Sequence, residues 1–345
     1  YTVILPPGIK TFAIKYQGEI YPPLRQQGEE YARSFSETAG MISPDGIYLA
    51  SSSFWYPWFS DDEVSFTLDV QLPEGWEAVS QGERTRHTHS SPAIVRWESP
   101  EPQEGIYLVG GRYTEYNRTA GAVQVMAFLR SPDQELASQY LEMTGRYLEM
   151  YRKLIGPYPY KKFALVENFW ETGYGMPSFT LMGSKVIRLP FILYSSYPQE
   201  ILHNWWGNGV YVDEEGGNWS EGLTTYLADY LIQEQKGTAA ESRRATLQKY
   251  SDYVDQAEDF PLTEFRSRHS SVTEAVGYGK TLMFFHMLRQ RLGDKGFMRA
   301  LQKFYRDYQF KHAGFGDLKK VFSHTAGQDL EAEFSQWINR AGAPI

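Results

Sequence analysis

The first third of the chain alternates apolar and polar residues with a period of two. Residues 64–70 place valine, phenylalanine, leucine and valine at every second position, and residues 93–97, 106–109 and 123–129 contain similar short runs. Turn residues separate these runs. Such a pattern is typical of half-buried β-strands. We therefore predict a β-rich N-terminal domain over residues 1–129.

The apolar spacing then changes to the helical period. Ser131, with Pro132 directly after it and Gln134 three positions on, predicts a helix that begins with Ser131 as its N-cap. Helical patterns dominate from Ser196 onward. We expect an α+β protein, in which a second, mainly helical domain occupies residues 130–345.

The composition of the 345 residues narrows the chemistry. The chain contains no cysteine, which excludes a thiol nucleophile, a disulfide framework and any thiolate ligand to a metal. The formal net charge of −8 disfavours broad binding to nucleic acid or anionic membranes. We see no apolar run of the roughly 18 residues that a membrane span needs. The compartment and the oligomeric state stay open, as does a signal or anchor upstream of Tyr1, and strands of the first domain could be missing there too.

One segment of the helical region carries the residue types of a metal site. Gln199, Glu200 and His203 occupy the positions of a His-Glu-x-x-His motif, with glutamine in place of the first histidine. In that motif both histidines hold zinc from one helix face and the glutamate polarises a water. Glu221 begins a second amphipathic helix. Its carboxylate could complete a site made only of nitrogen and oxygen donors.

The surrounding residues extend this similarity. The chain has His-Asn-Trp-Trp-Gly-Asn at 203–208, Trp-Ser-Glu-Gly-Leu at 219–223 and Val-Gly-Tyr-Gly-Lys at 276–280. Together with Gly-Pro-Tyr-Pro-Tyr at 156–160, these segments resemble the gluzincin zinc aminopeptidases of the alanyl aminopeptidase and leukotriene hydrolase type. The resemblance covers roughly residues 130–345.

The resemblance implies a thermolysin-like catalytic domain that binds zinc and hydrolyses peptides. Glu200 would then be the general base that activates a water, with His203 and Glu221 as zinc ligands. Tyr278 would donate a hydrogen bond to the developing oxyanion, a contribution of about 2.7–4 kcal/mol in other enzymes.

Gln199 departs from this pattern and has two readings. A carboxamide oxygen is a weaker zinc donor than imidazole, so Gln199 could be a degenerate ligand in an impaired site. Alternatively, Ser196 and Gln199 have the spacing of a capping box, in which the glutamine side chain would bind the backbone N–H of Ser196. The sequence does not show whether this glutamine is natural or engineered.

A second departure lies in the segment that resembles the family's substrate-binding edge strand. There the family carries a glutamate that holds the substrate α-amine, and this chain has Pro177. Glu167 and Glu171 lie just upstream and could substitute, although exposed carboxylates at a strand end are the commoner interpretation. The predicted substrate-binding residues are Gly173, Tyr174, Gly175 and Met176.

Two functions follow as hypotheses. The first is a zinc metallopeptidase of aminopeptidase type with an impaired metal site, acting on a peptide by means of a metal-activated water. The alternative is a catalytically inactive pseudo-peptidase that binds a peptide or a protein, since Gln199 and Pro177 each remove a function without an obvious structural gain. The sequence does not distinguish exo- from endo-acting cleavage.

Overall fold

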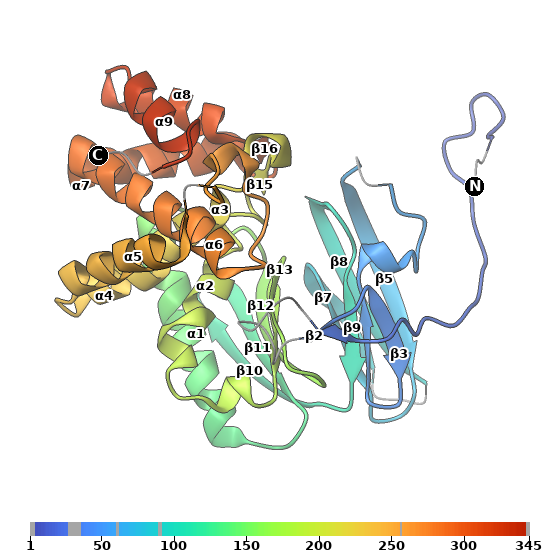
Figure 1. Ribbon diagram of the computed structural model, residues 1–345. Helices are drawn as coiled ribbons and strands as arrows, with labels where there is room; N and C mark the ends of the chain where they lie inside the picture. The colour runs from blue at the N-terminus through green and yellow to red at the C-terminus, as the bar shows by residue number, and fades with distance from the viewer. Residues whose placement is uncertain (1–3, 27–35, 60–61, 89–91, 256, 343–345) are drawn as a thin grey trace.

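The computed structural model describes residues 4–26, 36–59, 62–88, 92–255 and 257–342 (Figure 1). The start of the first predicted domain, residues 1–3, and the end of the second, residues 343–345, lie outside these ranges. Helices gather on one side of the molecule, β-strands on the other, and a mixed sheet lies between them.

The β-rich side consists of several small antiparallel sheets. A four-stranded sheet has the order β3-β4-β9-β6, and a three-stranded sheet has the order β5-β8-β7. The alternation of apolar and polar residues at 64–70 predicted a strand, and the structure confirms it as β5. The elements of this side are β1 (Arg25–Gln26), β2 (Ser36–Glu37), β3 (Gly40–Ser43), β4 (Gly46–Leu49), η2 (Ser51–Ser53), β5 (Val64–Leu72), β6 (Glu77–Ser80), β7 (Glu83–Thr88), β8 (Ala93–Gln103) and β9 (Leu108–Gly111).

A five-stranded mixed sheet joins the two halves of the chain. Its order is β10-β11-β12-β14-β13, with β11 and β12 parallel, β12 and β14 parallel, and β13 antiparallel at one edge. Its strands are β10 (Thr114–Ala120), β11 (Val123–Leu129), β12 (Lys162–Asn168), β13 (Gly173–Met176) and β14 (Phe179–Gly183). Because β10 and β11 belong to this sheet, it favours a domain boundary before Thr114 rather than at residue 129. The division of the chain into domains stays a prediction.

Both faces of this sheet are covered, which explains why β12 is buried along its whole length. Val125 and Leu165 on one face pack in the core of the helical side. Met126 and Val166, one residue further on, pack in the core of the β-rich side. Successive side chains of a strand point to opposite faces, so a sheet between two cores needs apolar residues at every position.

The helical side carries the remaining elements, several of which contact one face of the sheet. Strands β15 (Tyr211–Val212) and β16 (His312–Ala313) form a short parallel pair there. The helices and helical turns are α1 (Gln134–Leu154), η3 (Val186–Arg188), η4 (Ile192–Tyr194), α2 (Ser196–Leu202), η5 (Glu214–Gly216), α3 (Ser220–Thr225), the π-helical η6 (Tyr226–Tyr230), α4 (Leu231–Gln235), α5 (Ala239–Tyr253), η7 (Leu262–Glu264), α6 (Ser271–Glu274), the π-helical η8 (Ala275–Lys280), α7 (Thr281–Tyr308), α8 (Phe315–Ala326) and α9 (Glu331–Ile338).

The start of α1 differs from the sequence prediction. The N-cap is Asp133, whose Oδ1 accepts a hydrogen bond from the Leu136 N–H at 3.0 Å, and not Ser131. A carboxylate one residue before the first helical turn reaches the free N–H groups directly. It also interacts favourably with the positive end of the helix dipole. The predicted cap was therefore two residues too early.

The aromatic residues of the helical side form much of its core. Trp205 and Trp206 are fully buried. Trp206 packs against Trp219 and Phe304, and the indole N–H of Trp205 donates to the Gly156 carbonyl. The mixed content confirms the predicted α+β class. Among the described residues, no helix is both long and apolar enough to cross a membrane.

Candidate active site

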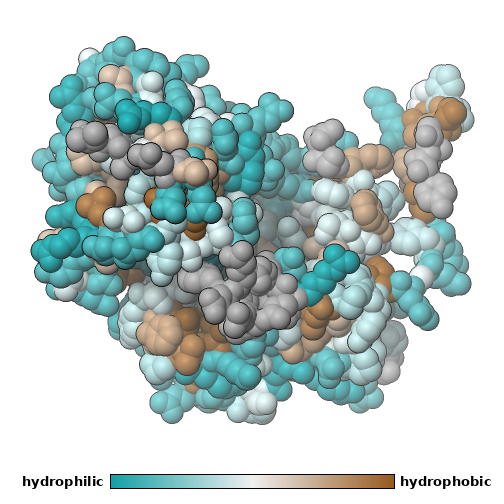
Figure 2. All heavy atoms as spheres, in the orientation of Figure 1, coloured by the Kyte–Doolittle hydropathy of each residue, from teal (hydrophilic) through white to brown (hydrophobic). Residues whose placement is uncertain are grey.

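A cleft of about 890 Å³ lies where the β-rich side, the edge strand and the helical side meet. The β-rich side contributes Tyr48 and Glu104, the edge strand β13 contributes Gly175, and the helical side contributes Arg268. In Figure 2, a hollow separates the helical side from the β-rich side of the surface. The predicted site residues all line this one cleft: Gly173, Tyr174, Gly175, Met176, Gln199, Glu200, His203, Glu221 and Tyr278.

Three helical elements bring the polar side chains together. Gln199 and Glu200 lie on α2, and His203 continues that helix by donating its N–H to the Gln199 carbonyl at 2.9 Å. Glu221 lies in the first turn of α3, and Tyr278 lies in η8. Helices α2 and α3 contact each other, so the tertiary packing places Glu221 opposite His203.

The imidazole of His203 is oriented toward Glu221. Its Nδ1 lies 3.2 Å from the Trp206 carbonyl oxygen, which can only accept a hydrogen bond. Nδ1 therefore carries the proton of the neutral ring, and Nε2 keeps its lone pair. Nε2 lies 3.6 Å from Oε2 of Glu221. This is the tautomer that a metal-binding histidine needs.

The environment of Glu200 suits a general base. The pKa of Glu200 is raised to about 7, mainly by burial; the charge of His203 opposes this rise, Glu221 adds to it, and Arg268 opposes it. A base with a pKa near neutrality combines the correct protonation state with enough basicity. Burial, together with the adjacent Glu221 carboxylate, raises the pKa of Tyr278 well above its usual value, so its hydroxyl remains a proton donor.

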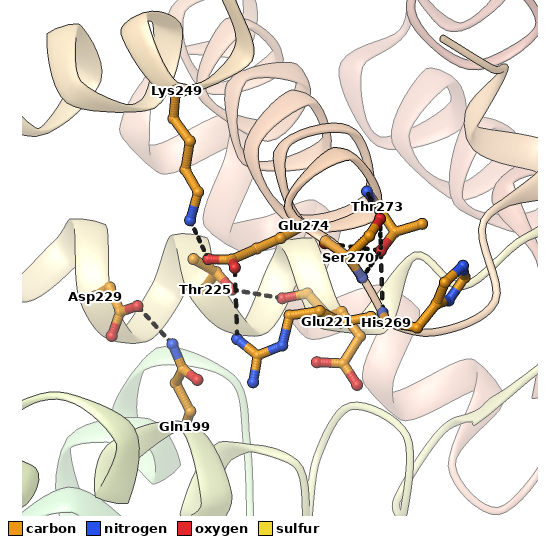
Figure 3. Close-up of polar contacts among 10 residues, drawn as sticks. Gln199, Glu221, Thr225, Asp229, Lys249, His269, Ser270, Thr273 and Glu274 are labelled. Atoms are coloured by element: carbon orange, nitrogen blue, oxygen red, sulfur yellow. Dashed lines mark hydrogen bonds and ion pairs between the residues drawn. The ribbon is translucent and has the colours of Figure 1, made fainter. Parts of the chain in front are cut away.

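The Gln199 side chain does not form the capping box that its spacing suggested. Its Nε2 donates a 2.5 Å hydrogen bond to Oδ2 of Asp229, and the α2 N-cap, Ser195, accepts no side-chain hydrogen bond from the helix. Figure 3 shows the two side chains pointing toward each other, with the amide oxygen of Gln199 turned away from Asp229. The buried carboxylate competes better for the amide than an exposed backbone N–H, because Asp229 has few other partners.

The donor set fits a divalent metal ion. Bonds of about 2.0–2.2 Å from His203 and Glu221 to one ion would leave their ligand atoms close to the observed 3.6 Å separation. The oxygen of Gln199 is a third available donor on the same wall of the cleft. One nitrogen and two oxygens are a weaker set for zinc than two nitrogens and one oxygen. The residues therefore fit zinc, with less affinity than a site that has both histidines.

A second cluster, Glu77, His87 and Glu115, lies on the β-rich side. Both oxygens of Glu115 accept hydrogen bonds from the Arg84 guanidinium, at 2.6 and 2.7 Å. Since the guanidinium of Arg84 already binds the Glu115 carboxylate, we interpret this cluster as an ion-pair network.

The edge strand β13 lies directly against helix α2. A Cβ on Gly175 would lie 2.5 Å from Oε2 of Glu200 and 3.4 Å from side-chain atoms of His203. A side chain at this position would therefore displace the Glu200 carboxylate from its place beside the strand. The backbone of β13 forms the wall of the cleft beside Glu200.

Pro177 has a structural role that the sequence did not reveal. Residues Met176 and Phe179 pair across β13 and β14, which leaves Pro177 and Ser178 as a two-residue turn. Ser178 has a φ of 67°. Proline followed by a residue of positive φ is the arrangement of a type II turn. The expectation that this proline brings no structural gain is therefore wrong.

The turn is anchored from two directions. The Ser178 N–H donates to Oδ1 of Asn204 at 2.7 Å, and the Asn204 amide donates to the Ile201 carbonyl at the end of α2. From the other side, the fully buried ammonium of Lys162 donates to the Ser80 carbonyl and to both oxygens of Ser178. These contacts fix the turn relative to α2 and to β6, and they use all three protons of the ammonium.

The two upstream carboxylates do not reach the cleft. Glu167 is buried, accepts the Arg130 N–H at 2.8 Å and pairs with Arg188 at 2.7 Å. Glu171 accepts the Lys185 N–H at 3.1 Å. The interpretation of Glu167 as an exposed strand-end carboxylate is wrong, because the sheet buries it between two arginines. Neither residue lines the cleft where a substrate amine would be held.

Sequence reasoning missed three residues of this region. Asp229, Asn204 and Arg268 contact or line the site. Asn204 lies within the segment 203–208 that carries the resemblance, but the sequence assigned it no role, and Asp229 and Arg268 lie outside the quoted segments. Arg268 lies with its guanidinium carbon 5.4 Å from the ring centre of Tyr278.

Residues 198–337 match the peptidase family M1 domain. This match covers less than half of the chain and agrees with the resemblance of residues 130–345 to the gluzincin zinc aminopeptidases. Gln199 stands where the motif implied by that resemblance has its first histidine.

Individual relatives are distant in sequence. The alanine/arginine aminopeptidase of Saccharomyces cerevisiae is 22% identical over 275 residues, which cover 71% of this chain and 31% of that protein. The chain thus spans about a third of the length of that relative. An M1 zinc metallopeptidase from Deinococcus radiodurans superposes with a TM-score of 0.70 at 18% identity, covering 88% of this chain and 72% of the other.

A mutant of the same Deinococcus radiodurans protein, bound to a Tyr-Ser-Ala substrate, superposes with a TM-score of 0.69 at 19% identity. That structure covers 88% of this chain and 73% of its own. At this identity the superposition shows a common fold.

Proposed function

We propose that this chain is a peptide hydrolase whose metal site is weakened but retained. The observation that supports it most is the convergence of Glu200, His203, Glu221 and Tyr278 on one cleft, with a pKa of about 7 for Glu200. Perturbed carboxylates in a cleft are typical of catalytic sites. The family of the chain supports the same reaction class.

His203, Glu221 and the oxygen of Gln199 would hold the metal. Zinc, when bound, would supply Lewis acidity at the scissile carbonyl and acidify a water. Glu200 would take the proton from that water and deliver it to the leaving amine, and the short distance between Glu200 and the Gly175 backbone keeps the carboxylate beside the substrate strand. The Tyr278 hydroxyl would donate to the oxyanion.

The substrate would be a peptide in extended form along β13. This strand is the last of the five-stranded sheet, so its outer edge can add the backbone of another strand. Tyr174 and Met176 would then contact alternate side chains of that peptide. Since Pro177 occupies a turn, we do not place the α-amine of the substrate there. Strand β13 therefore does not specify whether cleavage occurs at the amino end of the peptide or within it.

The experiment is metal analysis of the purified chain after incubation with excess zinc, followed by assays on a panel of fluorogenic peptides. We expect substoichiometric to equimolar zinc, lost on dialysis against a chelator, and slow hydrolysis that disappears in Glu200→Gln. A chain that holds no zinc under excess metal and cleaves no peptide would contradict the proposal.

The second candidate is a peptide-binding module without catalysis, favoured by Gln199 in place of a histidine. In that case the same peptides would bind with unchanged affinity in the presence of a chelator, and Glu200→Gln would not alter binding. Calorimetric titration of an uncleaved peptide with and without zinc separates the two functions.

A further inference from the structure

The hydrogen bond between Gln199 and Asp229 involves a carboxylate that the sequence did not associate with the site. Oδ2 of Asp229 accepts the Gln199 amide N–H, and Oδ1 is buried with no hydrogen-bond partner among the described residues. Leaving a carboxylate oxygen unsatisfied in the interior costs stability. Within the part of the chain that the structure describes, Gln199 is the one hydrogen-bond partner of the Asp229 carboxylate.

The π-helical segment η6 explains how Asp229 reaches this position. On a regular α-helix, a residue eight positions after Glu221 would be rotated about 80° away from it. A π-helical turn contains about one extra residue, which reduces that offset to roughly 20°. The π-helical segment η6 follows Glu221 and contains Asp229. Both α3, which carries Glu221, and η6 contact helix α2, so the two carboxylates face the same neighbouring helix.

The contact determines which end of the carboxamide faces the cleft. The hydrogen bond runs from Nε2 of Gln199 to Oδ2 of Asp229, so the carboxylate accepts from the NH₂ group of the carboxamide. The amide oxygen then points away from Asp229, as Figure 3 shows. An amide in the opposite orientation would direct an NH₂ group into the site, and this group has no lone pair available for a metal.

We propose that Asp229 is a positioning residue for side chain 199: it holds the N–H end of Gln199, so that the amide oxygen is the donor atom presented beside His203 and Glu221. This inference rests on the proposed function, since it concerns the same metal site. Residues that orient metal ligands in this way typically change affinity by about 10–100-fold when they are replaced.

The test compares zinc affinity, measured by competition with a chromophoric chelator, in four variants. Asp229→Ala removes the acceptor, and we expect zinc to bind about 10–100-fold more weakly. Asp229→Asn keeps an acceptor oxygen of the same shape without the charge, and we expect affinity close to that of the unmodified chain. The absorption spectrum of the cobalt-loaded protein should shift in Asp229→Ala and stay unchanged in Asp229→Asn.

Gln199→Ala provides the background that separates positioning from a general effect. Without a side chain to hold, Asp229→Ala should cause no further loss of zinc affinity. An equal loss in both backgrounds, or an equal loss in Asp229→Asn, would show that the charge of Asp229 acts directly on the metal and would overturn the inference. Thermal unfolding in the presence of a chelator checks that each variant folds.

A chain with Gln199 that holds no zinc at all would overturn the proposed function instead. The positioning role is then measured in Gln199→His, where an imidazole N–H takes the place of the amide N–H. There, Asp229→Ala must weaken zinc binding by about 10–100-fold and Asp229→Asn must not. Failure of that pattern would refute the role of Asp229 independently.

Discussion

Two positions depart from the pattern that the resemblance implies, Gln199 on the wall of the cleft and Pro177 next to it, and their side chains have different fates in the structure. Gln199 keeps a donor atom on the wall of the cleft, because Asp229 binds only its amide nitrogen. Pro177 is committed to the turn between β13 and β14, and the residue after it is fixed by Asn204 and Lys162. A substitution inside a site therefore need not abolish the function of that position. The outcome depends on whether the new side chain still faces the ligand.

The largest expected effect comes from Gln199→His. An imidazole at this position would restore a nitrogen donor while its N–H replaces the amide N–H at Asp229. Replacing a residue that only orients a metal ligand lowers metal affinity by about 10–100-fold. Gaining a full ligand should therefore raise zinc affinity by at least about 100-fold. We expect peptide hydrolysis to rise in parallel. The measurement is chelator competition combined with a fluorogenic assay.

A matched control is Gln336→His, which adds a histidine on the exposed face of α9. This variant should bind zinc no better than the unmodified chain. If Gln199→His gains neither affinity nor activity, the cleft is not a metal site and the contrast between the two positions disappears.

The next effect concerns the contact between β13 and Glu200. Gly175→Ala would place a methyl group 2.5 Å from Oε2 of Glu200, so the carboxylate must move. A displacement of about 1 Å of a catalytic group can lower the rate by roughly 100-fold. We expect a loss of that order in kcat, measured in the Gln199→His background, with little change in thermal stability.

Gly316→Ala on α8 is the control for this prediction, because a Cβ at the exposed Gly316 meets no atom within 4 Å and the residue does not line the cleft. It should retain full activity. Equal activity of the two variants would show that Glu200 does not depend on the close approach of β13.

A third prediction is a pH-dependent change in stability. Burial raises the pKa of Glu200 from 4.5 to about 7, so the folded protein retains a proton that the unfolded chain releases. The stability associated with this group is complete below about pH 4.5 and is lost as the pH rises through 7. The neutral variant Glu200→Gln does not have this loss.

Measured without metal at about pH 8, Glu200→Gln should have a free energy of unfolding about 1–3 kcal/mol above that of the unmodified chain. The two proteins should converge below about pH 5. Denaturant unfolding at several pH values is the measurement, with the exposed Glu258→Gln as control. A difference independent of pH would contradict the buried state of Glu200.

The smallest effect is expected at the turn. Pro177→Ala and Pro177→Glu should each lower stability by about 0.4–1 kcal/mol, because proline restricts the unfolded chain at a compatible turn position. Pro177→Glu should not improve binding of a peptide with a free amine, since the turn holds this position away from the ligand. A selective fall in KM for such a peptide would show that position 177 still faces the substrate.

Local patterns predicted the parts of this protein that depend on near neighbours in sequence. The period-two runs predicted strands β5 and β11. The resemblance around Glu200, His203 and Glu221 pointed to the same family as the domain that matches residues 198–337. The cap of α1 was misplaced, because several polar residues next to one another can cap the same helix.

The sequence by itself determined the fold class, the resemblance to a peptidase family and a set of residues that line one cleft, because strand and helix periods and motif spacings depend on the order of residues. Only the tertiary structure decided what Gln199 and Pro177 do. The partners of Gln199 and of the Pro177–Ser178 turn lie 30, 26 and 16 positions away, at Asp229, Asn204 and Lys162. Contacts over such separations arise when helices and strands pack against each other, and no local pattern encodes them.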